Sequence, residues 1–450
     1  MDAIAWLRRW AERVLCDWEY LPWLAVPLLL FECLLCGAII LRVPYTKIDW
    51  DAYMSEVAGP LQHGQWDYAQ LKGETGPLVY PAGFVYAYGA LRWLGGGDGS
   101  DVRAVQWAFG GLYVATQAVV LAIYARARPR AMAPWALLLL CASKRMHSLF
   151  VLRLFNDCLG MALLYGAVLA ALANSRRGWT VAALLFSLSV SVKMNAMLAA
   201  PGLAVLMIEA LGLAGALRRI GLCAGVQLLL GAPFLAAAPR AYLRGAFGGF
   251  GDLQQLWSVN WKFLSEEAFF SPRLTAALLV AHVGLLLHLG ARRWCARGGL
   301  SVPAMVRRLL TRAEPAGEAR ALHAEHVVGV MLSCNFVGVA FCRSLHFQFY
   351  TWYWHALPFL LWRATCLPLP AKLAVLAALE YAWSYGLDKV VGTSTPLSSL
   401  VLQLAHLVTL AGIVLTPAGP VLIDDDEDDD DDAKTQKKEG VALAATKKAD

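Results

Sequence analysis

Long apolar stretches separated by short polar segments run along most of this chain. The first, from Trp23 to about Val43, reaches the roughly 20 residues that a helix needs to cross the hydrocarbon core of a bilayer. Because a backbone in lipid must satisfy its own hydrogen bonds, the stretches predict helices, whereas a transmembrane barrel would show short segments of alternating polarity. The first stretch is too long and too internal for a cleaved signal peptide, so we expect it to stay. The pattern predicts an all-α polytopic membrane protein.

The stretches divide into about twelve spans when the arginine-rich segments are placed in the cytosol, as the positive-inside rule requires. Arg8, Arg9 and Arg13 precede the first span and place the N-terminus there. The predicted spans are 23–43, 104–124, 132–148, 158–173, 179–192, 200–216, 220–237, 274–290, 327–342, 354–366, 371–387 and 397–415. An even number of spans returns the C-terminus to the cytosol.

One apolar patch, Phe84–Gly95, decides this topology. Counting it as a span would place Arg126, Arg128 and Arg130 outside, against the positive-inside rule. The patch is short and follows Pro81. We therefore interpret it as a helix lying on the membrane surface.

The composition agrees with this class and limits the functions that fit it. Of 450 residues, 58% are hydrophobic and only 16% charged, and the mean hydropathy is +0.52, far from a soluble globular average. The ten cysteines lack paired metal spacing, so we predict no metal, no cofactor and no disulfide framework. The GGFG near Gly248 lacks the Lys-Ser/Thr of a P-loop, which argues against ATP-driven transport.

The C-terminal tail supports the same orientation. An acidic run, Asp424–Asp432, is typical of a disordered, solvated segment. The chain then ends in Lys447, Lys448, Ala449 and Asp450, which resembles the dilysine retrieval signal of endoplasmic reticulum (ER) membrane proteins; a chance pair in a lysine-rich tail is the alternative. Because that signal works from the cytosol, the outer face is predicted to be the ER lumen.

This topology divides the chain into segments with different predicted environments. They are a cytosolic N-terminal segment (1–22), a transmembrane domain (23–415) with a first luminal loop (44–103), a long luminal loop (239–273) and a basic cytosolic loop (291–325), and a cytosolic tail (416–450).

Five polar clusters fall on the luminal side, and each also has a plain structural interpretation. In the first, Asp49 is a candidate general base toward a hydroxyl, although carboxylates at a span end are often only solvated. Asp51 lies two residues on, so only one of the two acids is expected to point into a site. Trp50 suits an interfacial belt or a sugar platform.

The second and third clusters, RLFND and SVKMN, supply charged groups at span ends. Arg153 and Asp157 are four apart, and the plain interpretation is an ion pair at a helix start, with Asp157 a further candidate acid. Lys193 and Asn195 end an otherwise apolar span. A lysine there either extends to the interface or awaits an anionic headgroup.

The fourth and fifth clusters are the most aromatic. WSVNWKFL carries Trp257, Asn260, Trp261 and Lys262, which an aromatic belt explains about as well as ligand binding does. RSLHFQFYTWYWH carries Arg343, His346, Gln348, Tyr350, Trp352, Tyr353 and His355, a density of polar groups that a belt alone does not explain. Five clusters on one side favour one luminal site facing the membrane.

Six motifs carry a resemblance to a known enzyme family: IDWDAYM, GPLVYPAGF, RLFND, SVKMN, VNWKFL and SLHFQFYTWYWHALPFLLW, in this order. Together they resemble the ER α-1,3-mannosyltransferases that extend the lipid-linked N-glycan precursor, which are GT-C-type membrane enzymes. The resemblance runs from about residue 40 to 415 and leaves out the acidic tail.

The resemblance implies the substrates and the stereochemistry. The donor is dolichyl-phosphate mannose and the acceptor is Man5GlcNAc2 on dolichyl pyrophosphate. Transfer from a β-linked donor to an α product implies inversion by a single displacement with one base and without a metal. The base is carried onto Asp49, whereas the family pattern needs no acid at Asp51.

The remaining roles are assigned by chemical type. Cations and donors stabilise a departing phosphate, and aromatic faces stack on sugars or line an isoprenoid groove. Candidates for the donor phosphate or the substrates are Arg153, Lys193, Asn195, Asn260, Lys262, Arg343, His346, Gln348 and Tyr350; candidates for platforms are Trp50, Trp257, Trp261 and Trp352.

Two alternatives remain open from the sequence. One is a mannosyltransferase with another lipid-linked acceptor. The other is a proton-coupled sugar or lipid transporter, which would usually show internal repeats and acids near the bilayer midplane, features that we do not find.

Overall fold

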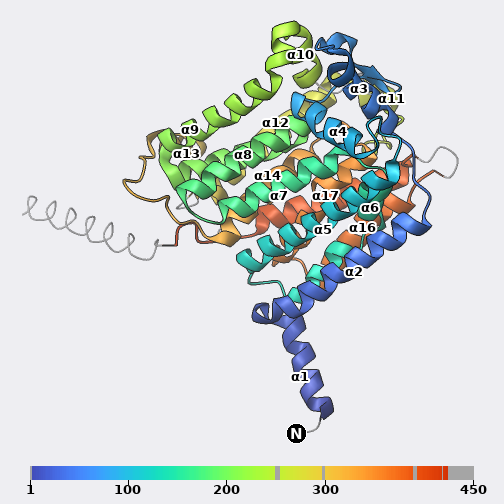
Figure 1. Ribbon diagram of the computed structural model, residues 1–450. Coiled ribbons are helices and arrows are strands. Elements are labelled where there is room, and N and C mark those ends of the chain that lie inside the picture. Colours follow the sequence, from blue (N-terminus) through green and yellow to red (C-terminus); the bar gives the residue numbers. More distant parts are fainter. Residues whose placement is uncertain (1–2, 249–253, 296–298, 389–392, 418, 424–450) are drawn as a thin grey trace, which may run out of the picture.

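Helices build nearly all of the protein, as the computed structural model in Figure 1 shows. The structure describes residues 3–248, 254–295, 299–388, 393–417 and 419–423. In these ranges the strands are β1 (Lys72–Gly73) and β2 (Gly76–Pro77), which pair antiparallel. The predicted all-α class is confirmed.

The elements follow one another with short connections. In the first half they are α1 (Ala3–Cys16), η1 (Trp18–Tyr20), α2 (Leu21–Arg42), α3 (Trp50–His63), η2 (Tyr68–Gln70), α4 (Ala82–Leu94), α5 (Val102–Ala127), η3 (Pro134–Cys141), α6 (Lys144–His147), η4 (Ser148–Leu152), α7 (Asn156–Ala171), α8 (Arg176–Val192), η5 (Met194–Ala199) and α9 (Ala200–Ala237). In the second half they are α10 (Pro239–Phe247), α11 (Glu266–Phe270), α12 (Pro272–Leu289), η6 (Gly290–Trp294), α13 (Val302–Thr311), α14 (Ala324–Ala340), η7 (Phe347–Trp352), η8 (Trp354–Ala356), α15 (Leu357–Arg363), α16 (Leu369–Glu380), η9 (Tyr381–Tyr385) and α17 (Pro396–Leu415).

Several helix starts follow directly from local sequence. The side chain of Asp101 accepts a hydrogen bond from the Ala104 backbone N–H at the start of α5. Ser175 caps α8 in the same way through the N–H of Gly178. Because the first N–H groups of a helix have no partner inside it, such side chains fix where each helix begins.

Membrane-length helices are fewer than the predicted spans. Within the described residues, five helices are long and apolar enough to cross a membrane, and up to six if a bent pair counts as one span. That pair, Pro134–Cys141 with Lys144–Leu152, is bent by 52°, so the predicted span 132–148 is not a straight helix. The protein is a polytopic membrane protein, and the count of twelve spans stays a prediction.

The predicted spans 200–216 and 220–237 are joined in α9, and the break lies earlier than expected. Gly212 has φ 72° and ψ 169°, which interrupts the helix. A Cβ at this position would collide with the backbone of Ala313, so only glycine fits. The backbone N–H of Leu213 donates to the Arg312 carbonyl at 3.0 Å. Arg218 and Arg219, which stand between the two predicted spans, lie inside the second part of α9.

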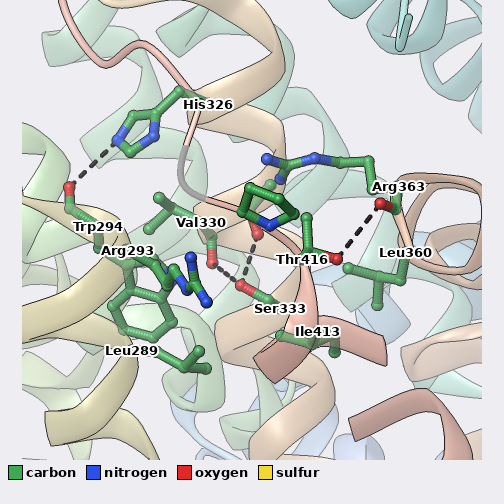
Figure 2. Close-up of a pocket in the computed structure, with 13 residues that line it drawn as sticks. Leu289, Arg293, Trp294, His326, Val330, Ser333, Leu360, Arg363, Ile413 and Thr416 are labelled. Carbon is green, nitrogen blue, oxygen red and sulfur yellow. Dashed lines mark hydrogen bonds between the residues drawn. The ribbon is translucent and has the colours of Figure 1, made fainter. Parts of the chain in front are cut away.

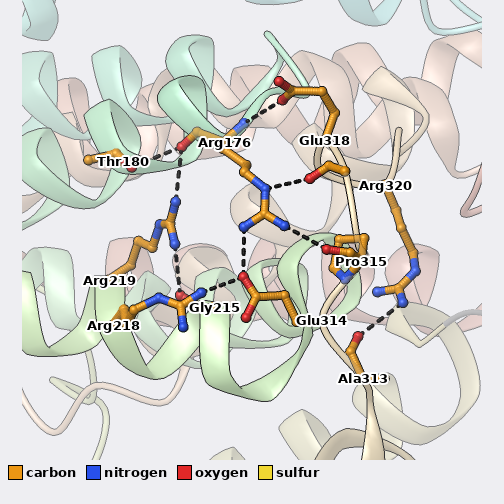
Figure 3. Close-up of polar contacts among 11 residues, drawn as sticks. Arg176, Thr180, Gly215, Arg218, Arg219, Ala313, Glu314, Pro315, Glu318 and Arg320 are labelled. Carbon is orange, nitrogen blue, oxygen red and sulfur yellow. Dashed lines mark hydrogen bonds and ion pairs between the residues drawn. The ribbon is translucent and has the colours of Figure 1, made fainter.

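Those arginines belong to a polar network that ties segment 312–320 to α8 and α9 (Figure 3). Glu314 accepts from Arg176 at 2.6 Å and also pairs with Arg218. Arg176 donates two further bonds of 2.6 Å to backbone carbonyls at Pro315 and Gly317. The segment is therefore held against the helices by paired charges.

The first loop forms a small helical layer over one end of the bundle. Helix α4 replaces the predicted surface helix Phe84–Gly95, and its 13 residues are too few to cross a bilayer. Its inner face buries Phe84, Val85 and Tyr88 completely, and it packs against α3 and α8. In Figure 1, α3, α4, α10 and α11 gather at this end. Whether α4 lies on the membrane surface stays a prediction.

Candidate functional site

Helix α3 places three polar groups along one of its faces. Asp49 is the residue before the helix, and Tyr53 and Glu56 follow at positions four and seven residues later. The Tyr53 hydroxyl donates to Asp49 Oδ2 at 3.2 Å. Glu56 is only 3% exposed, and its Oε2 has no hydrogen-bond partner. Because a buried carboxyl usually has its oxygens paired, Glu56 is a notable feature of this face.

A buried ion pair lies beside this face. Lys193, at the end of α8, donates to Asp157 Oδ2 at 3.1 Å and to Asn156 Oδ1 at 3.0 Å. Both members of the Lys193–Asp157 pair are at most 1% exposed. The lysine therefore does not extend to the membrane surface, which was one of the two interpretations of the sequence.

The same pair corrects the interpretation of Arg153 and Asp157 as an ion pair at a helix start. Leu154 adopts φ 54°, and α7 begins only at Asn156, so Arg153 and Asp157 do not share a helix. Four-residue spacing brings side chains together only within one helix. Asp157 pairs with Lys193, and Arg153 instead donates to the Ser148 hydroxyl.

Aromatic rings enclose the ion pair. The Lys193 ammonium lies 4.6 Å from the ring centre of Tyr80 and 5.7 Å from that of Phe349. The Trp352 indole donates to Asp157 Oδ1 at 2.6 Å and stacks on Phe349 at 3.7 Å. The rings keep water from the pair, which strengthens every charge interaction there.

Electrostatics at the site favour proton transfer near neutral pH. Burial raises the pKa of the Asp49 carboxyl, and the Lys193 charge and the Tyr53 hydrogen bond partly offset that rise. Burial also raises the pKa of Glu56 to about 8, with the negative charge of Asp49 as the second cause. Glu56 is thus mostly protonated at pH 7, while the Lys193 charge and the Tyr53 hydrogen bond favour the ionised form of Asp49.

Some predicted residues of the first loop lie away from this cluster. Asp51 forms an ion pair with Lys47 on the exposed side of α3. Trp50 is 1% exposed, and its indole donates to the Gly99 carbonyl at 2.9 Å. Trp50 is therefore a core residue of the loop and not an exposed platform. His346 lies beside the cluster, with its ring tilted against that of Phe349 at 5.3 Å, and interacts with the Lys193 charge.

The fourth cluster has mainly a structural role in the described residues. Asn260 accepts from the Leu345 N–H and donates to the Cys342 carbonyl, each at 2.8 Å, so it fixes one loop to the other. Trp261 donates to the same carbonyl at 3.2 Å. Lys262 donates to the Leu256 carbonyl at 2.8 Å. The structure does not bring this lysine to Lys193.

The remaining predicted residues are scattered around the same end. Arg343 donates to the Thr275 hydroxyl at 2.9 Å, and its guanidinium lies over Phe269. Asn195 donates to the Met161 sulfur, Trp257 is 45% exposed, and Gln348 is partly buried. Lys447 and Lys448 lie outside the described residues.

Tyr350 marks a second polar group on the other side of η7. Its hydroxyl donates to Glu380 Oε2 at 2.9 Å, as does that of Ser143 at 2.7 Å. Arg145 interacts with Glu380 and also with the like charge of Arg153. Two arginines near one carboxylate leave a net positive charge.

Sequence reasoning missed Glu56, Glu380 and Arg145. Glu56 lies seven residues after Asp49, which is the helical spacing that returns to the same face, so that signal was available. Arg145 stands in the KRMH segment beside the second cluster. Nothing local identifies Glu380, because only tertiary packing brings α16 to η7 through the Tyr350 bond.

The fold and this site together define the class. At one end, a bundle of apolar helices carries a layer of short helices. This end holds a carboxyl group with an unpartnered oxygen, a buried lysine and surrounding aromatic rings. That arrangement suits a multi-spanning membrane enzyme that activates a hydroxyl beside a charged lipid substrate.

Comparison with known proteins identifies the family within this class. The family model described as "ALG3 protein" matches residues 26–387, and the chain belongs to that family. No solved structure matches the chain significantly.

Characterised relatives from three kingdoms carry one name. The chain is 43% identical over 402 residues to the Dol-P-Man:Man(5)GlcNAc(2)-PP-Dol α-1,3-mannosyltransferase of Arabidopsis thaliana, covering 88% of each protein. It is 42% identical over 418 residues to the human protein of that name, covering 92% of each, and 39% identical over 394 residues to that of Neurospora crassa, covering 86% of each.

Proposed function

We propose that this protein transfers mannose from dolichyl-phosphate mannose, in α-1,3 linkage, to Man5GlcNAc2 on dolichyl pyrophosphate. The observation that carries the proposal is the acid and lysine cluster around Asp49, which lies within the segment shared with relatives of that name. The reaction is proposed to take place at the luminal face of the ER membrane, with both termini in the cytosol. The positive-inside pattern supports this orientation.

Asp49 is proposed as the base of a single displacement. The acceptor hydroxyl oxygen forms a bond to C1 of mannose while the bond from C1 to the dolichyl-phosphate oxygen breaks. The hydroxyl proton passes to Asp49, and the bonding electrons leave with the phosphate. The Tyr53 hydroxyl, 3.2 Å from Oδ2, orients the carboxylate for this step.

The departing phosphate requires positive charge nearby. The Lys193 ammonium already donates to Asp157 and Asn156. Its proposed role is therefore to stabilise the negative charge of the Asp49 carboxylate. Arg145 and Arg153 repel one another and have Glu380 as a nearby acid. An anion held between the two arginines would relieve that repulsion, which favours them for the phosphate.

Glu56 is proposed to contact the acceptor sugar. It lies on the Asp49 face of α3 and is mostly protonated at pH 7, so its hydroxyl donates and its unpartnered oxygen accepts. Sugar hydroxyls offer both complementary groups. The carboxyl would then position the hydroxyl that Asp49 deprotonates.

An acceptor panel tests the proposal against both alternatives. Purified protein is incubated with radiolabelled dolichyl-phosphate mannose and with Man5GlcNAc2-PP-dolichol or a glycolipid-anchor precursor. Label in an α-1,3-linked product of the first acceptor supports the proposal. Label only in the second would assign another acceptor. No transfer, together with movement of the donor or a sugar across the membrane of proteoliposomes, would indicate a transporter.

A further inference from the structure

A cavity opens at the end of the bundle opposite the candidate site. It is open to the surface and lies among the ends of α12, α15 and α17 and the first half of α14 (Figure 2). The candidate site follows the other end of α14, where η7 begins. The proposed mannosyl transfer uses none of the residues that line this cavity.

Two arginines enter the cavity from opposite sides, as Figure 2 shows. Arg293 donates through Nη2 to the Val414 carbonyl at 2.9 Å, and its buried Nε has no hydrogen-bond partner. Arg363 pairs with Glu325 at 3.1 Å. No acidic residue is among the described residues that line the cavity, and Glu325 lies outside this lining. The site therefore carries an excess of positive charge and an unsatisfied donor.

The backbone of α14 is shaped to accept one of these arginines. A Cβ at Gly329 would collide with the Arg363 guanidinium, so the group lies directly against the helix. The Ser333 hydroxyl lies in the same cavity and already donates to the Gly329 carbonyl at 2.5 Å, which leaves its oxygen free to accept. The charge at Arg363 is therefore held in place by the fold.

Besides the two arginines and the polar residues His326, Ser333 and Thr416, the lining of the cavity is apolar. Trp294, Val330, Leu360 and Ile413 line the cavity between the arginines. The neighbouring helices also expose apolar side chains: Val280 on α12 is 71% exposed and Leu407 on α17 is 58% exposed. In a polytopic membrane protein such faces contact lipid chains.

We propose that this cavity binds the phosphate of an anionic membrane lipid, with Arg293 and Arg363 as its cations and the acyl chains along α12 and α17. Guanidinium groups match phosphate oxygens in a bidentate geometry and give up their hydration readily. The apolar helix faces favour a lipid over free phosphate, because a free ion would gain nothing from them.

Lipid retention tests the proposal independently of mannosyl transfer. Full-length protein is placed in nanodiscs of phosphatidylcholine with about 10% phosphatidic acid. The protein is then released from the nanodiscs, and native mass spectrometry identifies the lipids that it retains. We expect one retained phosphatidic acid per protein, with about tenfold preference over phosphatidylcholine, and loss of that preference in Arg293→Gln/Arg363→Gln. Equal retention of both lipids by the wild type would overturn the proposal.

Matched variants separate the cavity from general surface charge. Arg292→Gln removes an exposed neighbour whose guanidinium donates to the Gly299 carbonyl, so it should keep the preference. Arg293→Gln alone leaves the Arg363–Glu325 pair intact and keeps the test valid if the double variant fails to fold. Loss of preference in Arg292→Gln but not in Arg293→Gln would contradict the assignment. Displacement of the lipid by millimolar inorganic phosphate would assign the site to the free ion instead.

Discussion

The two ends of the bundle both concentrate charge but balance it in opposite ways. Away from the candidate site, Glu209 is completely buried yet pairs with Arg308 at 2.9 Å and Arg312 at 3.3 Å. Glu314 likewise has two arginine partners. Both of these acids are matched by more than one cation.

At the candidate site the balance reverses, because Asp49, Glu56 and Asp157 surround one lysine. Burial raises the pKa of Asp49 and of Glu56, and one oxygen of Glu56 has no partner. Acids that are fully paired with arginines hold segments in place, whereas acids without a full set of partners and with raised pKa values are suited to exchange protons. The comparison shows that the reactive end is marked by acids that lack cationic partners, more than by the number of charges.

The strongest test of this contrast replaces the proposed base. Asp49→Asn should lower the turnover of mannosyl transfer about a thousandfold, since general base catalysis contributes roughly 10²–10⁴. The matched control is Asp51→Asn, whose ion pair with Lys47 is exposed, and it should change turnover less than threefold. A comparable loss of turnover in both variants would contradict the assignment of Asp49 as the general base.

Removing the lysine should affect both stability and turnover. Lys193→Met leaves the buried Asp157 carboxylate without its lysine partner, with the Trp352 indole still donating to it, which costs about 3–5 kcal/mol of folding free energy. Turnover should fall about a hundredfold, because the Lys193 charge no longer lowers the pKa of the Asp49 carboxyl. Thermal unfolding in detergent and initial transfer rates measure the two effects.

A double variant separates the effect of Lys193 on stability from its effect on turnover. Adding Asp157→Asn to Lys193→Met removes the uncompensated charge and should restore most of the unfolding temperature. Turnover should stay low. Recovery of both quantities together would reduce the lysine to a structural role.

Glu56 should control the alkaline side of the pH profile. Because its carboxyl is protonated below a pKa of about 8, transfer that depends on the neutral form should decline as pH rises through that value. Glu56→Gln, which stays neutral, should keep turnover within about threefold at pH 7 and flatten this limb. An unchanged limb would mean that Glu56 does not titrate in the reaction.

Stability should follow the same titration. The pKa of Glu56 is raised in the folded protein, so the stabilising contribution of its proton is complete below pH 4.5 and is lost as pH approaches 8. Relative to Glu56→Gln, the wild type should therefore unfold at progressively lower temperatures across this range.

The smallest effect is expected at the end of the bundle where the acids are paired with arginines. Glu314→Gln removes two partly exposed ion pairs, which solvent screens, so the unfolding temperature should fall by only a few degrees. Turnover should not change. A large loss of turnover in this variant would mean that the docked segment 312–320 acts on the distant site.

Much of the fold was predictable from the sequence, because apolar stretches and helix caps are local signals. The break in α9 was not, since Gly212 is fixed by the backbone of Ala313 a hundred residues later. Asp49, Asp157 and Lys193, from the first three polar clusters, lie together in the structure. Their pairing was not predictable, because the turn at Leu154 separates Arg153 from Asp157.

The most direct test measures donor binding and transfer in parallel on purified Asp49→Asn protein. If Asp49 acts only as the base, the dissociation constant for dolichyl-phosphate mannose should stay within about threefold of the wild type while transfer to Man5GlcNAc2-PP-dolichol falls about a thousandfold. Transfer that persists at the wild-type rate, or donor binding that is lost together with it, would contradict the assignment of Asp49 as the base.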